Sequence, residues 1–357
     1  GEDELIVAGS TWFMGYKIDN GDFWGWQKEY DGWGACWMDG DGITTNDDGT
    51  TNDDRMKKRM WPLMWYGIRK ANVGLQHLND MRDCTTEEYN LIAGQLYFFR
   101  GWFHFMLMQY FGGLPYVDHV LSSSPISVRL PRLSYHECAN KVAEDLQRAA
   151  LLLPVDWDDT TVGKNTLGKN RQRINKIMAL GFLGKNYLWA GSPLMNYEST
   201  GEKAYNKEYC KKAADVFAEM LSLCRDYSLM DFNEYSSIFY TLNQGYKIPG
   251  GTEAIFMPPV FQAWGTYWSQ SNQYTPGVLL DGASNMFCPT ANYVNYYGMA
   301  NGLPIPDCTK ADAASGYDPQ HPWQNRDPRF YHDIVYDGVK CIQGATSTRE
   351  AHRYANL

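Results

Sequence analysis

The stretch GQLYFFRGWFHFMLMQYFGG, residues 94–113, constrains the fold of this chain more than any other segment. Its apolar residues are not confined to one stripe, so a helix formed here has no face that is suited to water. Gln95, Arg100, His104 and Gln109 interrupt the apolar run, whereas a membrane span needs about 20 predominantly apolar residues. The segment therefore predicts a helix that is buried between other elements rather than a transmembrane helix.

Local signals place the ends of this helix. Thr85 followed by Glu88 forms a capping box, in which the Thr85 side chain accepts from the Glu88 N–H and the Glu88 carboxylate reaches back. The glycines and the proline of FGGLP, which follow the aromatic run, are typical of a helix end. We expect a helix over 86–111, with Arg100 paired to a buried carboxylate or carbonyl and without a catalytic role.

Four further segments show the apolar periodicity of helices. They are residues 60–80, 134–154, 172–190 and 208–224, and the second begins with another capping box, Ser134 with Glu137. The predicted apolar stripes are Met64, Tyr66, Ile68, Ala71, Leu75 and Leu78; Ala139, Val142, Leu146, Ala149 and Leu153; and Ala214, Phe217, Met220 and Leu221.

The predicted helices fall into pairs, 60–80 with 86–111 and 134–154 with 172–190. Small residues in each pair allow two helices to approach closely: Ala93, Gly94 and Gly101 in the first, and Ala179, Gly181 and Gly184 in the second. This arrangement predicts tetratricopeptide-type helical hairpins, in which each hairpin buries its face on the next. Long loops interrupt the series, and no regular 34-residue repeat is present.

The two ends of the chain differ from the middle. Residues 1–59 and 226–357 are rich in Gly, Asn, Asp, Pro and aromatic residues and have few periodic segments. Within them, EAIFMPPVF predicts a short strand and CPTANYVNYYGM a short helix. We therefore expect one mainly α domain over 1–357, with a helical-hairpin half at 60–225 and a loop-rich, irregular face, carrying short strands, built from both ends.

Composition and motifs exclude several functions. A net charge of −9 argues against nucleic acid as a partner. The eight cysteines contain no C-x-x-C pair, so neither a zinc site nor a redox pair is indicated. No nucleophile elbow, zinc-protease or nucleotide-binding motif occurs, so we predict no enzyme and no catalytic residue. DGDGITTNDDGT departs from the calcium-loop pattern at Ile43 and Thr50; we expect no cofactor, with calcium as the weaker alternative.

Two loop segments, residues 33–54 and 260–274, combine aromatic rings with polar side chains. The whole chain holds 13 Trp and 25 Tyr. A sugar presents apolar C–H faces and a rim of hydroxyls, so rings beside Asn and Asp suit it. The second segment also has no charged residue between Glu253 and Asp281. The alternative is that these rings only hold long loops in place. The predicted ligand-binding residues are Trp33, Trp37, Asp41, Asn46, Asp47, Asn52, Trp264, Tyr267, Trp268 and Tyr274.

Six segments resemble the SusD/RagB family in order and spacing. They are WYGIRKAN, GQLYFFRGWFHFMLMQYFGGLPYV, EDLQRAALLLP, INKIMALGFLGKNYLWAGSPL, TEAIF, and NGLPI with GYDPQHPWQNRDPRFY, which together lie within about residues 60–335. The aromatic helix ending in FGG-x-P and the NRDPR segment carry most of the resemblance. It implies a SusD-like fold of tetratricopeptide-like helix pairs with an irregular second face. Because the family normally continues past NRDPR, we expect the chain to be incomplete at its C-terminus.

The resemblance also implies a function. Members of the family are surface-exposed lipoproteins of the outer membrane that capture a nutrient, usually a glycan, and lid a SusC-like TonB-dependent transporter. We therefore expect an oligosaccharide-binding protein of polysaccharide utilization that meets the membrane only through a lipid anchor outside this sequence. The alternatives are a carbohydrate-active hydrolase, whose carboxylates can lie far apart in sequence, and a protein-interaction scaffold or peptide-binding member of the family.

Overall fold

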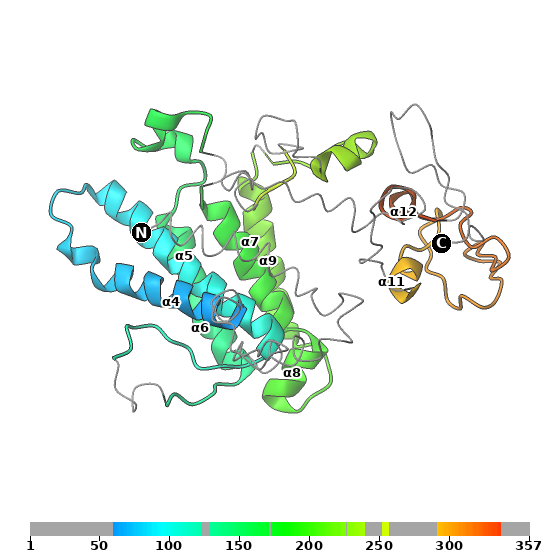
Figure 1. Ribbon diagram of the computed structural model, residues 1–357, viewed down its shortest axis with the longest axis horizontal. Helices are drawn as coiled ribbons and strands as arrows, with labels where there is room; N and C mark the ends of the chain where they lie inside the picture. The colour runs from blue at the N-terminus through cyan, green and yellow to red at the C-terminus, as the bar shows by residue number, and fades with distance from the viewer. Residues whose placement is uncertain are drawn as a thin grey trace, which may run out of the picture. The chain divides into compact units, whose positions relative to one another are not determined.

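A computed structural model describes residues 60–122, 129–170, 173–225, 227–239, 252–256 and 291–336. These residues belong to two compact units, the first within 60–256 and the second within 291–336. The first unit consists of packed helices and the second is mostly loops with two short helices (Figure 1). The predicted mainly α architecture is confirmed.

The first unit is a stack of antiparallel helical hairpins. Each long helix packs chiefly on the next one along the chain, α4 on α5, α5 on α6, α6 on α7 and α7 on α9. The predicted pairs are therefore present as α4 with α5 and α6 with α7. The α-helices are α4 (Met60–Gln76), α5 (Thr86–Phe111), α6 (Tyr135–Leu152), α7 (Lys176–Ala190), α8 (Pro193–Thr200) and α9 (Lys207–Leu223). Short 3-10 helices are η3 (Leu78–Asp80), η4 (Trp157–Asp159), η5 (Gly163–Thr166) and η6 (Phe232–Phe239).

Both predicted capping boxes are formed. The Thr85 N–H donates to Glu88 Oε2 over 2.7 Å, and the Glu88 N–H donates back to Thr85 Oγ1 over 3.2 Å. Ser134 and Glu137 repeat the arrangement at the start of α6. Hydrogen bonds from the two caps lower the pKa of both glutamates, so each carboxylate is charged where it faces the positive end of its helix.

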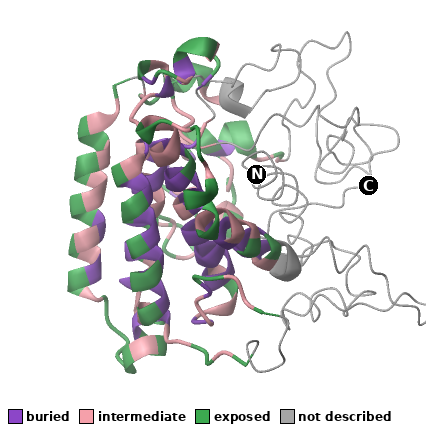
Figure 2. Ribbon diagram, turned by 90° about the vertical axis from the view of Figure 1, so that its left-hand side faces the viewer, coloured by how far each residue is buried: buried purple, intermediate pink, exposed green. Residues whose placement is uncertain are grey.

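Helix α5 is the centre of the core. It lies between α4 and α6, and its rings pack on residues from both sides; Phe98, Phe103 and Phe105 are fully buried. Figure 2 shows the buried positions lying along the inward sides of the helices, with the exposed positions on the outward sides. The prediction of an enclosed helix is confirmed, and no helix in the described ranges is both long and apolar enough to cross a membrane.

Glycines allow the close approach that the sequence predicts. A Cβ on Gly94 would lie 2.7 Å from Leu153 Cγ, and one on Gly184 would lie 2.6 Å from the Phe217 ring. Both distances are shorter than any ordinary carbon–carbon contact, so a side chain at either position would push the neighbouring helix away. The spacing of α5 from α6 and of α7 from α9 therefore depends on these positions having no side chain.

Three residues of the predicted stripes are exposed instead of buried. Tyr66 projects from the opposite side of α4, because it is two residues from both Met64 and Ile68, which lie in the core. On α9, Ala214 and Leu221 face solvent. The helix is buried only along the side that meets α7, where Tyr209 and Ala213 lie in the core with Phe217 and Met220 packed against it. Helix α9 is thus rotated relative to the predicted stripe.

The predicted strand is also wrong over the residues that are described. Residues 252–256 form a turn and a bend, and Ile255 and Phe256 pack on the helical core. Their apolar character reflects this packing, since the Phe256 ring centroid lies 5.1 Å from that of Phe182. Across the described part of the chain, β-structure amounts to two isolated antiparallel bridges, Met299–Arg326 and Asp312–Tyr317. The predicted helix in CPTANYVNYYGM is present as α11 (Ala291–Asn295).

Candidate functional site

The residues that the sequence predicts for ligand binding all lie outside the described residues. This applies to Trp33, Trp37, Asp41, Asn46, Asp47 and Asn52 near the start of the chain, and to Trp264, Tyr267, Trp268 and Tyr274. Their role stays a prediction. The described residues contain a different cluster of rings, in the second unit, together with a buried polar network in the first.

The ring cluster of the second unit is built on the NRDPR segment. Asp327 caps the short helix α12 (Pro328–Asp333), accepting from the Arg329 N–H over 2.9 Å, and Pro328 takes the first helical position. These are preferred residues for a helix start, because a cap satisfies a free N–H and proline has none to lose. Arg329 also forms an ion pair with Asp327 over 2.6 Å. The segment therefore fixes the start of α12 by local interactions.

Arg326 joins this helix start to the segment around α11. Its side chain is buried, with 1% of its surface exposed, and donates to the carbonyls of Val294 (2.7 Å), Gly298 (3.2 Å) and Pro322 (2.9 Å). Its guanidinium lies 4.6 Å from the centroid of the Phe330 ring, a cation–π contact. Arg326 thereby ties the segment around α11 to the segment before α12 and holds the rings around them in place.

Six aromatic side chains form the ring cluster: Tyr293, Tyr297, Trp323, Phe330, Tyr331 and Tyr336. Trp323 stacks on Phe330, with centroids 5.8 Å apart and planes 13° apart. The Tyr331 hydroxyl donates to the Trp323 carbonyl over 2.7 Å and accepts from the Arg326 N–H over 3.0 Å. The Tyr297 hydroxyl donates to Asp333 over 2.9 Å, and burial raises the pKa of Tyr297. Stacking and hydrogen bonds therefore hold Tyr297, Trp323, Phe330 and Tyr331, the inner rings of the cluster, in fixed positions.

The outer rings of the cluster are accessible. Tyr293 is 54% exposed and Tyr331 is 40% exposed, and Tyr296, which lies outside the cluster in the turn after α11, is 84% exposed. Gln324, Arg329 and Asp333, on the segments that carry the inner rings, are exposed as well. Fixed rings beside side chains that can bond two adjacent hydroxyls are suited to the apolar face and polar rim of a sugar.

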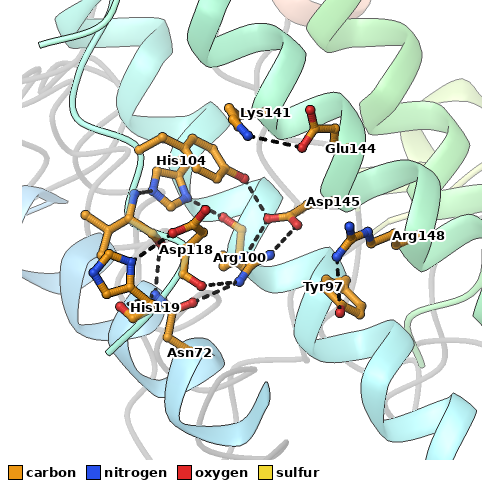
Figure 3. A network of polar contacts seen from close by, with 12 residues as sticks. Asn72, Tyr97, Arg100, His104, Asp118, His119, Lys141, Glu144, Asp145 and Arg148 are labelled. Atoms are coloured by element: carbon orange, nitrogen blue, oxygen red, sulfur yellow. Dashed lines mark hydrogen bonds and ion pairs between the residues drawn. The ribbon is translucent and has the colours of Figure 1, made fainter. Parts of the chain in front are cut away.

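The buried network of the first unit centres on Arg100 of α5 (Figure 3). Its guanidinium pairs with the Asp145 carboxylate of α6, with Nε 2.6 Å from Oδ2, and also donates to Asn72 Oδ1 (3.0 Å) and the Asp118 carbonyl (2.8 Å). Tyr116 donates to the same carboxylate over 2.6 Å. The prediction that Arg100 pairs with an internal carboxylate or carbonyl is confirmed, since it bonds one of each. The contacts fasten the segment after α5 to three helices.

His104 completes this network in its neutral form. Its Nε2 accepts from the Val117 N–H over 3.1 Å, so Nδ1 carries the proton and donates to the Arg100 carbonyl over 2.8 Å. Complete burial lowers the pKa of His104 to about 3. Because Arg100 and His104 are both enclosed and hydrogen-bonded to protein groups, we assign the network a structural role.

Sequence reasoning missed the ring cluster and most partners in the network. The repeated tyrosines of NYVNYY and the aromatic end of NRDPRFY were the available signals for the cluster. Arg100 and His104, four residues apart in an apolar helix, were the signal for the network. Within the described ranges, no three His, Cys, Asp or Glu side chains are grouped so that they could hold a metal ion.

Comparisons with known proteins give a consistent set of similarities. Residues 27–188 match a family model described as starch-binding associating with outer membrane, and residues 252–354 match the model of the SusD family. SusD-like protein P2 of Formosa agariphila is 26% identical over 153 residues, which cover 43% of this chain and 27% of that protein.

Solved structures are similar in fold. A SusD-like protein from Bacteroides fragilis aligns with a TM-score of 0.58 at 22% identity, over 83% of this chain and 52% of its own length. A SusD-like carbohydrate binding protein from the same species aligns with a TM-score of 0.55 at 20% identity, over 85% of this chain and 50% of its own. The chain thus spans about half the length of these solved relatives and about a quarter of the Formosa protein.

Proposed function

This chain belongs to the SusD/RagB family, and from that premise we propose that it binds oligosaccharides at the cell surface without hydrolysing them. In this proposal it is a lipoprotein of the outer membrane, and it passes its ligand to a SusC-like TonB-dependent transporter for import. The proposal is supported by the description of the matching family model, starch-binding associating with outer membrane.

The single observation that carries the binding proposal is the ring cluster of the second unit. Trp323 is held parallel to the fully buried Phe330, Arg326 fixes the backbone beside them, and Tyr293 is the exposed ring of the cluster, with Tyr296 exposed next to it in sequence. A platform fixed before the ligand arrives loses little conformational entropy on binding. Few charges have to be desolvated either, since Arg329 is already paired with Asp327.

The binding proposal is tested by calorimetry with a panel of oligosaccharides on the purified chain. We expect Tyr293→Ala and Tyr296→Ala each to weaken binding by about 1–3 kcal/mol, if a sugar face stacks on a ring as a base does. Tyr205→Ala is the matched control, because Tyr205 is an exposed tyrosine of the helical unit, and its affinity should be unchanged. If all three variants bind oligosaccharide with the affinity of the parent chain, the binding site does not lie at the ring cluster.

The same incubations separate binding from hydrolysis. We expect the oligosaccharide to be recovered intact after prolonged contact with the protein, and release of reducing ends would replace the proposal with a carbohydrate-active hydrolase. Trp264→Ala and Trp268→Ala, in the ring-bearing loop predicted from the sequence, belong in the same series. A loss of affinity there would extend the site to that loop.

The transporter is tested separately, by isolating the full-length protein from detergent-solubilised outer membranes. We expect a TonB-dependent transporter to co-purify in a fixed ratio, both with and without glycan. Recovery of the protein alone under conditions that preserve other outer-membrane complexes would contradict the import role, while leaving the binding proposal intact.

A further inference from the structure

The charges of the second unit bear on which saccharides its ring cluster can bind. Residues 291–336 contain five Asp and no Glu against one Lys and two Arg, so this stretch carries a net charge of −2 with its two histidines neutral. A field of this sign repels anions. A glycan that carries carboxylate or sulfate groups would therefore need a nearby cation of the protein to bind here.

Arg326 is enclosed and cannot serve as that cation. Only 1% of its surface is exposed, and its guanidinium donates to the carbonyls of Val294 (2.7 Å) and Pro322 (2.9 Å). The Phe330 ring lies against it, with its centroid 4.6 Å from the guanidinium carbon. An anion could reach this side chain only by displacing the hydrogen bonds that hold the unit together.

The two remaining cations of residues 291–336 are exposed, and both are paired with carboxylates. Arg329 holds Asp327 at two points, with Nε donating to Oδ1 over 3.0 Å and Nη2 to Oδ2 over 2.6 Å, the geometry of a strong ion pair. The hydrogen bonds from Arg329 lower the pKa of Asp327, so this carboxylate stays charged. Lys310 lies 3.1 Å from Asp307 Oδ2. Each Lys and Arg of this described stretch is thus already engaged with protein acceptors.

Asp333 places a carboxylate beside the rings. It is the last residue of α12, is exposed, and accepts from the Tyr297 hydroxyl over 2.9 Å. The Tyr297 ring in turn meets the exposed Tyr293 ring edge to face, with centroids 5.8 Å apart and planes at 86°. Burial, followed by the hydrogen bonds with Asp333 and Tyr293, raises the pKa of Tyr297, so its hydroxyl keeps its proton next to the carboxylate. A single ring therefore separates this negative charge from the exposed Tyr293.

We propose that the ring cluster selects neutral saccharides, and that the Asp333 carboxylate is a specificity-determining group that excludes glycans carrying carboxylate or sulfate. The inference rests on the proposed function, because it concerns the same site. A neutral glycan supplies hydroxyl donors for a carboxylate and an apolar face for Tyr293. An acidic glycan brings an anion toward Asp333 while the arginines of the unit are engaged elsewhere, and like charges placed together at an interface are costly.

Chemical oxidation of the ligand provides matched probes. Oligomers of glucose, galactose and mannose are compared by calorimetry with the same oligomers after oxidation of their primary hydroxyls to carboxylates, and with the methyl esters of the oxidised forms. We expect the oligomer that binds to lose at least tenfold in affinity on oxidation and to regain most of it on esterification, since the ester removes the charge and not the bulk. The loss on oxidation should become smaller as salt is added, because salt screens the repulsion.

Asp333→Asn tests the residue itself. The variant keeps an oxygen that can accept from the Tyr297 hydroxyl and removes only the charge. We expect the ratio of the neutral to the oxidised affinity to fall several-fold. Asp83→Asn, which removes one negative charge at an exposed position of the first unit, is the matched control and should keep the ratio of the parent chain.

The outcomes separate selectivity from binding. If oxidised oligomers bind as tightly as neutral ones or more tightly, the selectivity proposal is overturned and the proposed function stands. The same holds if the methyl esters bind as weakly as the acids, since bulk would then explain the loss, or if Asp333→Asn keeps the parent ratio. If neither neutral nor oxidised oligomers bind, the proposed function fails and the selectivity proposal fails with it.

Discussion

Each of the two units contains a buried arginine, and the two are stabilised in different ways. Arg100 lies on a helix and pairs with the Asp145 carboxylate of the next helix. Arg326 lies in a loop and donates to backbone carbonyls, among them those of Val294 and Pro322. A helix uses most of its own carbonyls, so a cation buried between helices needs a carboxylate, whereas loops have carbonyls to spare.

The pKa values of the two side chains reflect this difference. Burial alone lowers the pKa of Arg100, but the hydrogen bond and the charge of Asp145 more than offset it, so the pKa is raised above its ordinary value. For Arg326 burial is the largest influence, and the pKa is lowered. The charge of Asp145 thus keeps Arg100 protonated despite its burial, whereas Arg326 has no carboxylate among the groups that shift its pKa.

The largest expected effect comes from breaking the ion pair in the helical unit. Asp145→Ala leaves Arg100 buried without a counter-ion and should lower the free energy of unfolding by about 3–5 kcal/mol. The free energy of unfolding is measured by urea titration, with the helical circular dichroism signal as the probe. Glu144→Ala, at the exposed neighbouring position, should cost about 0.5 kcal/mol or less. A similar small loss for both variants would mean that the buried pair contributes no more than a surface pair.

A smaller effect is expected in the loop-rich unit. Arg326→Met removes the donor from several buried carbonyls, and we expect a loss of about 2–3 kcal/mol, since part of the loop can turn its carbonyls toward water. Hydrogen exchange should increase over residues 291–336 and stay unchanged in α5 and α6. Arg329→Met, which alters an exposed arginine of the same segment, is the control. If hydrogen exchange over residues 291–336 increases equally in Arg326→Met and Arg329→Met, Arg326 stabilises this unit no more than the exposed arginine does.

The smallest effect is a dependence on pH in the helical unit. The pKa of His104 is about 3 in the folded chain and about 6.5 when unfolded. Between these values the unfolded chain binds the extra proton, so stability is lost as pH falls below about 6.5. The expected loss between pH 7.5 and pH 5 is about 2 kcal/mol.

His104→Gln isolates this contribution. Glutamine can still accept from the Val117 N–H but does not titrate, so the variant should lose about 2 kcal/mol of the pH dependence seen in the parent chain. Urea unfolding at a series of pH values gives the comparison, and identical pH profiles for the two proteins would show that His104 is not the group responsible.

The helical unit could be predicted closely because its signals are local. Thr85 with Glu88 and Ser134 with Glu137 place two helix starts within one residue of those observed. The errors come from tertiary contacts: which side of α9 is buried depends on where α7 lies, and Ile255 with Phe256 is apolar because it covers the helices. Neither the buried side of α9 nor the packing of Ile255 and Phe256 can be inferred from the residues next to them in the sequence.

The ring cluster could not be predicted in the same way. Arg326 donates to backbone carbonyls about thirty positions earlier in the chain. Because every residue has a backbone carbonyl, the sequence does not indicate which residues are the acceptors. The ring-bearing loops chosen from composition lie outside the described residues and stay a prediction.

The order of packing in the helical unit has a consequence for how it unfolds. Because α4 meets chiefly α5, α5 meets α6, α6 meets α7 and α7 meets α9, cooperativity in such a stack passes from neighbour to neighbour in one dimension. A helix at either end can separate while breaking a single interface, whereas α6 must break two. Fraying should therefore start at α4 and α9 and reach the Arg100–Asp145 layer last.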